Sequence, residues 1–418
     1  MKKKYQSQNL KKDFIWNTIG STINAFNSLF FMIFVTRING VFDAGIFTFA
    51  FSTSAVFNII GVYAGRVYQV TDNSKIRDYD YFINKGISCF IMLIVSIMFI
   101  LMRNYNMQKS FIIMAFCIYR MLEAFSELWY AYFQKKLELF KVGFSLTIKN
   151  IINLIVFIVI DLLTKNILIS AIGMIICYLI IMLVYDTKSI NVKDLLKNKI
   201  NWNNVFEIFK KGFFTFCLSF LTMYIINIPR YSIDSIMTDD FSTIFGILIM
   251  PASVITLMAQ FILHPFIMKI ANYIKKEDIF NMIKVIVKIN LIVFLFGIFA
   301  LIIAYLFGIP ILSLIYSIDL NEYKLSLIII MIGAIMNGIT MILSNVLIAM
   351  RITFKQAVIY LVNTIIAIFI SNYFVHVKGI FGACLSYFIT MFLVLICFIF
   401  LMIYSINKKR KEYNNEEG

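Results

Sequence analysis

The feature that most constrains this chain is a series of apolar runs, each long enough to cross a membrane. Twelve runs can be counted, near 14–36, 44–65, 86–102, 111–133, 146–163, 168–185, 213–234, 242–267, 289–307, 326–349, 356–374 and 381–404. A helix of about 20 mostly apolar residues spans a hydrocarbon core of ~30 Å. The sequence therefore predicts an all-α integral membrane protein with twelve transmembrane helices and no room for a soluble domain.

The distribution of charge predicts how these helices are oriented. The chain carries a net charge of +16, which in a soluble protein would suggest a nucleic-acid partner. Here the basic residues lie between the apolar runs, so we expect membrane lipids and no nucleic acid. With a cytoplasmic N-terminus, 30 of the 38 Lys and Arg residues lie on the cytoplasmic side and 7 outside, and we count Arg120 alone as lying well inside a span. Both termini are therefore predicted to be cytoplasmic.

The longest connection divides the runs six and six. We expect a six-helix lobe over 1–190, a cytoplasmic linker over 191–212, and a second six-helix lobe with a basic tail over 213–418. The two halves share short patterns, such as Asn150 and Asn363 near the start of each fifth span. Such matches favour an internal duplication, which is common in secondary transporters.

Signs of enzyme chemistry are missing from the sequence. There is no Gly-rich phosphate loop and no Ser/His/Asp set. His264 and His376 are too few and too isolated for a metal site. We interpret the pair Asp239 and Asp240 as a turn feature, and the six cysteines as small core residues that form no disulfides. The sequence predicts a protein that is not an enzyme and binds no cofactor or metal.

One stretch, from Tyr224 to Asp234, places charge deep in an apolar run. It contains Pro229 and Arg230. A charge at mid-bilayer costs on the order of 3 kcal/mol. Arg230 should therefore face a water-filled cavity, an acidic neighbour or an anionic ligand. The alternative is an interfacial arginine whose side chain reaches the membrane surface.

The fourth span carries a second charged cluster. Arg120, Glu123 and Glu127 follow one another at i, i+3 and i+7 and so share a helix face. One interpretation is a structural pair of Arg120 with Glu123. That pair leaves Glu127 unmatched, and an intramembrane carboxylate of this kind is a reasonable carrier for a proton or cation.

Polar stripes run along the leading helices of each half. The first span carries Asn17, Ser21, Asn24 and Ser28, and the eighth carries Ser253, Thr256, Gln260 and His264. Hydrogen bonding between helices, worth about 0.6–2 kcal/mol per contact, accounts for part of this pattern. It accounts less well for the concentration of the stripes in the leading helices of each half.

Four segments carry a resemblance to a known family. They are Arg37 and Gly40 followed by Gly45 and Phe47; Arg120 and Glu123 through Gln134 and Lys135; Pro229, Arg230 and Asp234 followed by Phe245 and Gly246; and Gly379 followed by Gly382 and Ala383. In this order and at these spans, the chain resembles the polysaccharide repeat-unit flippases (Wzx type) of the MOP/MATE-like superfamily. Ile244 and Asn39 depart from the usual residues of that pattern and leave the fine substrate class open.

The resemblance implies a fold and a function. It implies two six-helix lobes around a central cavity, lined by the first, second, seventh and eighth spans. It also implies an undecaprenyl-diphosphate-linked oligosaccharide that is flipped from the inner to the outer leaflet of a bacterial cytoplasmic membrane. Export of this kind supplies capsule, O-antigen or exopolysaccharide assembly, with a glycan polymerase as a possible functional associate.

Particular residues follow from this reading. We expect Arg37, Arg120 and Arg230 to meet the diphosphate, since guanidinium groups suit phosphate oxygens, with Asn24 and Gln260 as further substrate contacts. We expect Glu123, Glu127 and Asp234 to serve ion coupling. The sequence does not identify the coupling ion. The alternative function is a cation-coupled MATE-type exporter of small amphipathic compounds, which three arginines in the cavity disfavour. A glycan polymerase is disfavoured by the short outer loops.

Overall fold

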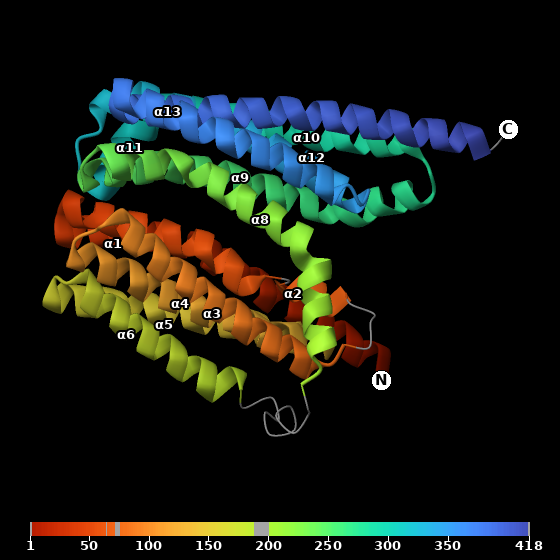
Figure 1. Cartoon of the computed structure of the whole chain (residues 1–418), viewed down its shortest axis with the longest axis horizontal. Helices are drawn as coiled ribbons and strands as arrows, with labels where there is room; N and C mark the ends of the chain where they lie inside the picture. The colour runs from red at the N-terminus through yellow and green to blue at the C-terminus, as the bar shows by residue number, and fades with distance from the viewer. Residues whose placement is uncertain (1, 64, 72–75, 188–199, 417–418) are drawn as a thin grey trace. The chain divides into compact units, whose positions relative to one another are not determined.

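In the computed structural model, residues 2–63, 65–71, 76–187 and 200–416 are described, and the regular elements among them are all helices (Figure 1). The chain forms two compact units, Met1–Phe220 and Leu221–Gly418. The predicted lobes and linker remain predictions, and residues 191–199 of the linker lie outside the described residues.

The described residues of the first unit form six complete α-helices, and the sixth continues into a wider, π-helical turn. They are α1 (Lys2–Val62), α2 (Gly65–Thr71), α3 (Asp78–Arg103), α4 (Met107–Lys135), α5 (Leu139–Thr164) and α6 (Ile167–Ile181), followed by the π-helix η1 (Met182–Asp186). Helix α8 (Trp202–Ile236) begins in this unit and continues into the second.

The second unit continues with α9 (Asp239–Lys275), α10 (Ile279–Ile303), the π-helix η2 (Ala304–Gly308) and α11 (Ile309–Tyr316). A short 3-10 turn, η3 (Asn321–Tyr323), leads into α12 (Lys324–Ala349), and α13 (Thr353–Glu416) follows.

The helices agree with an integral membrane protein. Within the described residues, nine helices are long and apolar enough to cross a membrane. Two of them are bent at a glycine with positive φ, α1 at Gly40 (φ 84°) and α13 at Gly379 (φ 55°). Glycine adopts this region without steric cost because it has no Cβ. Each bend separates two of the apolar runs counted in the sequence, and the total of twelve spans stays a prediction.

Corresponding turns of the two halves share an unusual backbone conformation. In each half, the second, third, fourth and fifth predicted spans each have a residue with positive φ at or shortly after their end. The matching pairs are Tyr63 and Glu277, Asn104 and Ser317, Leu137 and Arg351, and Lys165 and Gly379. Asn150 and Asn363 also donate to the carbonyl four residues earlier, at 2.8 and 2.9 Å. Other asparagines, such as Asn290 and Asn345, make the same bond, so the internal duplication stays a prediction.

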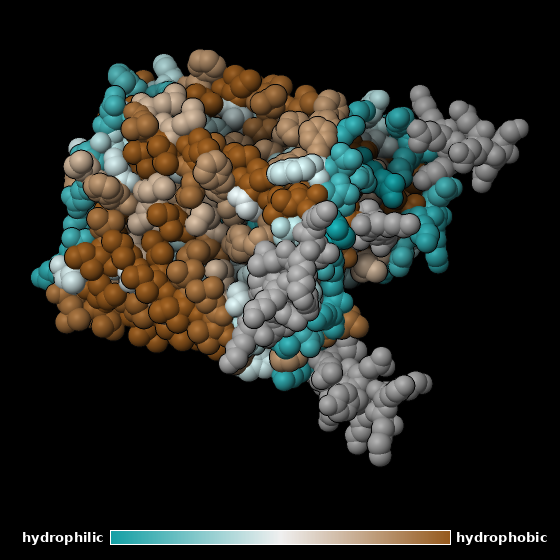
Figure 2. All heavy atoms as spheres, turned by 60° about the horizontal axis from the view of Figure 1, so that its bottom comes forward, coloured by the Kyte–Doolittle hydropathy of each residue, from teal (hydrophilic) through white to brown (hydrophobic). Residues whose placement is uncertain are grey.

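Apolar side chains form both the interior and the surface. In the first unit, the rings of Phe31, Phe47, Phe51, Phe116 and Phe157 pack together with centroids 5.1–6.3 Å apart. Many large apolar side chains are also exposed, and they cover most of the face seen in Figure 2. In a bilayer such a surface faces hydrocarbon, so it needs no further partner.

Helices α1 and α5 touch through their backbones at two glycines. A Cβ added to Gly143 would lie 2.2 Å from the carbonyl carbon and oxygen of Trp16, and one added to Gly20 would lie 2.4 Å from the oxygen of Gly143. Small residues permit such close approach between membrane helices, where dispersion contacts drive association.

We therefore expect Gly143→Ala to separate α1 from α5 and to destabilise the protein, at the upper end of the ~1–3 kcal/mol typical of overpacking. Thermal denaturation in detergent measures the effect. Gly86→Ala is the matched control, since a Cβ at Gly86 meets nothing within 4 Å. Equal melting temperatures for the two variants would show that the glycine contact does not hold the helices together.

Candidate functional site

Arg230 lies in the second unit, next to a helix-interior proline on α8. Pro229 has no N–H, so it leaves one helix carbonyl without its usual partner. The Arg230 residue is only 8% exposed. Its Nη1 lies 3.4 Å from Oδ1 of Asn227, and its Cζ lies 5.9 Å from the ring centroid of Phe245 on α9. The guanidinium group is thus held by a long hydrogen bond and an aromatic face.

Arg230 has no acidic partner among the described residues. No carboxylate of that part of the chain lies within the 4.0 Å of an ion pair, and the buried Nε has no hydrogen-bond acceptor. A buried charge without a counter-ion is costly. The structure thus supplies no acidic neighbour for Arg230, and the other three predictions, a water-filled cavity, an anionic ligand and an interfacial position, are left.

Arg120 and Glu123 form a close ion pair in the first unit. Nη1 of Arg120 lies 2.5 Å from Oε2 of Glu123, and both side chains are mostly buried. The Arg120 Cζ lies 4.4 Å from the ring centroid of Phe51 on α1. Its Nε is buried and has no acceptor in the described structure. Part of the guanidinium hydrogen-bonding capacity is therefore unused.

Glu127 has a cationic neighbour that was not predicted. Nε of Arg66 on α2 lies 3.8 Å from Oε2 of Glu127. The expectation that Glu127 is unmatched is therefore wrong, because it rested on residues of the same helix alone. Both side chains are about a third exposed, so the pair is a loose one.

The other predicted site residues lie on α1, α8 and α9. Asn24 is exposed and accepts a 3.2 Å hydrogen bond from Asn150, which itself accepts from Asn27. Arg37 is exposed on α1 near Gly40, Gln260 is exposed on α9, and Asp234 is partly buried on α8. The described residues contain no group of His, Cys, Asp and Glu suited to a metal ion, and all six cysteines are free.

A fully buried ion pair in the first unit was not predicted either. Lys149 on α5 pairs with Asp186 at the end of η1, and their side chains are 1% and 0% exposed. Lys149 also donates to Ser126 Oγ at 2.9 Å and to Tyr130 Oη at 3.1 Å, while Asp186 accepts from Ser145 Oγ at 2.7 Å. Three helical segments are thus joined by one closed polar cluster.

The sequence did contain a signal for this cluster. Lys149 lies within the apolar run 146–163, yet it was counted as a cytoplasmic residue. The statement that Arg120 alone lies well inside a span is therefore wrong, since α5 begins at Leu139 and buries Lys149. A lysine inside an apolar run predicts a buried acidic partner.

The known proteins to which this chain is similar match it in structure and not in sequence. No protein-family model and no curated protein matches its sequence. An inward-facing multidrug resistance MATE family transporter of the MOP superfamily matches with a TM-score of 0.70 and 11% identity, over 96% of this chain and 99% of that one. Lipid II flippase MurJ, in an inward closed conformation, matches with a TM-score of 0.69 and 13% identity, over 96% and 89%. A MOP superfamily transporter from Pyrococcus furiosus, described with a binding pocket of reverse polarity, matches with a TM-score of 0.56 and 12% identity, over 96% of both chains.

These similarities establish the fold. The chain has the multi-pass membrane fold of MOP-superfamily transporters, which includes both MATE exporters and a lipid flippase. The neighbours named above are transporters and not enzymes.

The buried pair of Lys149 and Asp186 generates a stability prediction. Lys149→Met or Asp186→Leu alone should cost about 3–5 kcal/mol, because each leaves an uncompensated buried charge. The double variant should recover most of that loss, since two apolar side chains replace the pair. Thermal denaturation in detergent gives the comparison.

Lys135→Met serves as the control for this prediction. Lys135 pairs with Asp78 at 2.8 Å near the surface, where an ion pair contributes only ~0–1 kcal/mol. A double variant as unstable as the worse single variant would contradict the assignment of the loss to an unpaired charge.

Proposed function

We propose that this protein is a flippase for lipid-linked oligosaccharides. The observation that carries the proposal is Arg230, a nearly buried guanidinium group without an acidic partner in the described structure. Such a group is stable in a membrane protein when water or an anionic ligand reaches it. A diphosphate supplies that negative charge in a form that guanidinium groups bind well.

The proposed substrate is an oligosaccharide repeat unit on undecaprenyl diphosphate. Arg120 supports a second phosphate contact, because its Nε has no acceptor while its Nη1 is occupied by Glu123. Arg37, Asn24 and Gln260 are proposed as further substrate contacts, and all three are exposed. The resemblance of the sequence to Wzx-type flippases and the structural similarity to lipid II flippase MurJ both support a lipid-linked cargo.

The cellular setting belongs to the same proposal. The protein would move its cargo from the inner to the outer leaflet of a bacterial cytoplasmic membrane, with both termini in the cytoplasm. The released repeat units would serve capsule, O-antigen or exopolysaccharide assembly, and a glycan polymerase would act on them next.

Ion coupling is proposed for the carboxylates. Glu127 is the leading candidate, because its 3.8 Å contact with Arg66 is loose enough to break during a cycle. Glu123 would respond to the substrate, since an anion bound to Arg120 competes with it. Asp234, partly buried on α8, is the candidate in the second unit.

The second candidate function is a cation-coupled exporter of small amphipathic compounds. The accessible carboxylate of Glu127 favours it, since it could also attract a cationic compound. The structural similarity to MATE transporters is compatible with it. The unpaired Arg230 counts against it, because a cationic compound would be repelled.

Arg230→Ala tests the phosphate contact. It should lower export of the lipid-linked glycan by at least about tenfold, because one charged hydrogen-bonding group is worth about 1.5–3 kcal/mol. Arg230→Lys should keep part of the activity, since lysine supplies the charge without the fork. Flipping of a fluorescent undecaprenyl-diphosphate oligosaccharide in proteoliposomes is the measurement.

The control is Arg103→Ala, which removes an exposed arginine at the end of α3. At equal protein level, normal flipping by Arg230→Ala would exclude a binding role for this residue. If Arg230→Ala instead lost drug efflux while its glycan flipping was unchanged, the result would favour the exporter.

Glu127→Gln tests the coupling role. The amide cannot ionise, so the variant should bind substrate normally but turn over slowly and with a weakened dependence on pH. Flipping rates measured at acidic and alkaline pH give the comparison, and Glu207→Gln, in an exposed pair with Lys211, is the control. A wild-type rate and pH response for Glu127→Gln would make this carboxylate structural.

A further inference from the structure

A long apolar groove runs along the second unit, outside the elements that carry Arg230. It has a volume of about 440 Å³ and is bounded by α10, α12 and the end of α13. Its lining includes Leu291 and Phe294 of α10, Leu343 of α12 and Ile403 of α13, and Asn290 is the polar exception among the lining side chains. The volume lies within the range of small-molecule sites, ~300–1,000 Å³. None of the lining residues belongs to α8 or α9.

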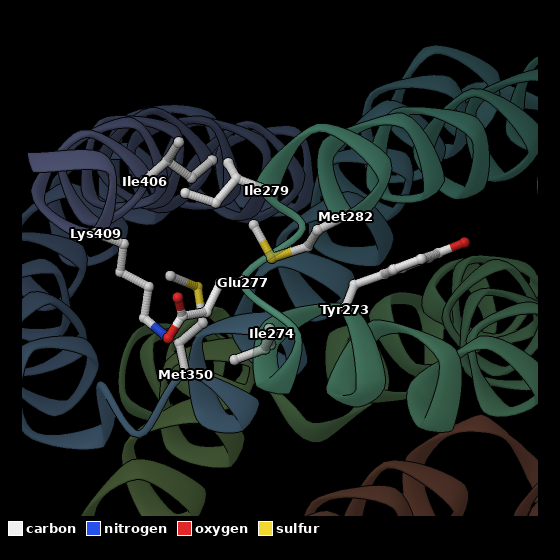
Figure 3. A pocket seen from close by; sticks show the side chains of 8 residues that line it. All are labelled: Tyr273, Ile274, Glu277, Ile279, Met282, Met350, Ile406 and Lys409. Carbon is white, nitrogen blue, oxygen red and sulfur yellow. The ribbon is translucent and has the colours of Figure 1, made fainter. Parts of the chain in front are cut away.

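One end of the groove is a polar mouth. Ile406 lines the groove and also a small adjoining recess whose wall includes Glu277 and Lys409. In Figure 3, Lys409 and Glu277 point toward one another next to Met350, and the apolar side chains of Ile279 and Ile406 lie beside each other. Helix α10 begins here at Ile279, and α13 passes here at Ile406 and Lys409, so both helices run from this mouth along the groove.

The mouth is basic. Lys284 and Lys288 are exposed on α10, each three residues before a residue that lines the groove, Val287 and Leu291. Side chains three apart are neighbours on a helix surface. Lys275, Lys276, Lys408 and Arg410 lie at the same helix ends. Among the side chains that the structure describes at these helix ends, the acidic ones are Glu277, which faces Lys409, and Asp278, whose carboxylate caps α10 through Asn281 at 3.1 and 2.7 Å.

We propose that this groove binds an anionic phospholipid of the surrounding bilayer, with an acyl chain along α10 and α13 and the phosphate near Lys284, Lys288 and Lys409. The apolar lining matches the chain, and burial of each CH₂ group is favourable. The excess of cationic side chains at the mouth matches the head group, since juxtamembrane lysines attract anionic lipids. The site is separate from Arg230, so the proposal does not rest on the identity of the transported substrate.

Retention of lipid by the purified, full-length protein tests the proposal. Protein in detergent is mixed with equal amounts of dioleoylphosphatidylglycerol and dioleoylphosphatidylcholine, and bound lipid is counted by native mass spectrometry. We expect phosphatidylglycerol to be favoured by at least about fivefold, the effect of roughly one lysine near an anionic lipid.

Two matched pairs of variants locate the lipid. Leu291→Trp places a larger side chain in the groove and should abolish retention of both lipids. Leu295→Trp makes the same change at a similarly exposed position of α10 that does not line the groove (Leu291 54% and Leu295 56% exposed), and it should behave as wild type. The double change Lys284→Gln and Lys288→Gln should remove the preference for phosphatidylglycerol. The control is Lys324→Gln with Lys378→Gln, which should keep it, because Lys324 at the start of α12 and Lys378 beside Gly379 line neither the groove nor the recess.

Three results would overturn the proposal. Equal retention of the two lipids by the wild type removes the head-group argument. Equal retention by Leu291→Trp and Leu295→Trp would show that the lipid does not bind in the groove. Displacement of phosphatidylglycerol by an equal amount of undecaprenyl phosphate assigns the groove to the isoprenoid carrier and not to a bilayer phospholipid.

Discussion

The first unit depends on one buried ion pair, between Lys149 and Asp186. In hydrocarbon there is no water to hydrogen-bond a polar group, so every buried charge needs a partner within the protein. Lys149 has three, namely Asp186, Ser126 and Tyr130, and these lie on α4 and at the end of η1. The last residue of the π-helix η1 is Asp186 itself, so the widened turn is where α6 contributes its carboxylate. The pair therefore fixes how α4, α5 and the end of α6 meet.

The buried charge of the second unit, on Arg230, has fewer partners than the one on Lys149. Arg230 is nearly as inaccessible as Lys149, yet the polar contact that holds it is a long hydrogen bond to Asn227. A protein that can neutralise a buried lysine so completely could do the same for an arginine. The contrast supports the proposal that Arg230 binds substrate, because a charge without a structural partner suits a group that meets a partner from outside.

The sequence predicted the fold better than the site. Apolar runs depend only on local composition, so the helices on either side of Gly40 and Gly379 could be located in advance. The charged stripe of Arg120 and Glu123 could be predicted too, because residues on one helix face have a fixed spacing. Arg66 and Asp186 could not, since each approaches its partner from another helix, and the packing of helices decides which side chains meet. The burial of Lys149 could have been predicted, because a lysine in an apolar run indicates a buried charge.

The short turns that repeat in both halves have a consequence for how the protein can be cleaved. Only residues 104–106 separate α3 from α4, 136–138 separate α4 from α5, and 350–352 separate α12 from α13. A protease binds several residues of substrate in an extended conformation, and these turns cannot be drawn out that far unless a helix end unwinds. Such unwinding would break backbone hydrogen bonds beside the membrane, where they are expensive to lose. The turns of the described structure are thereby resistant to digestion from either side of the bilayer, whichever way the chain is oriented.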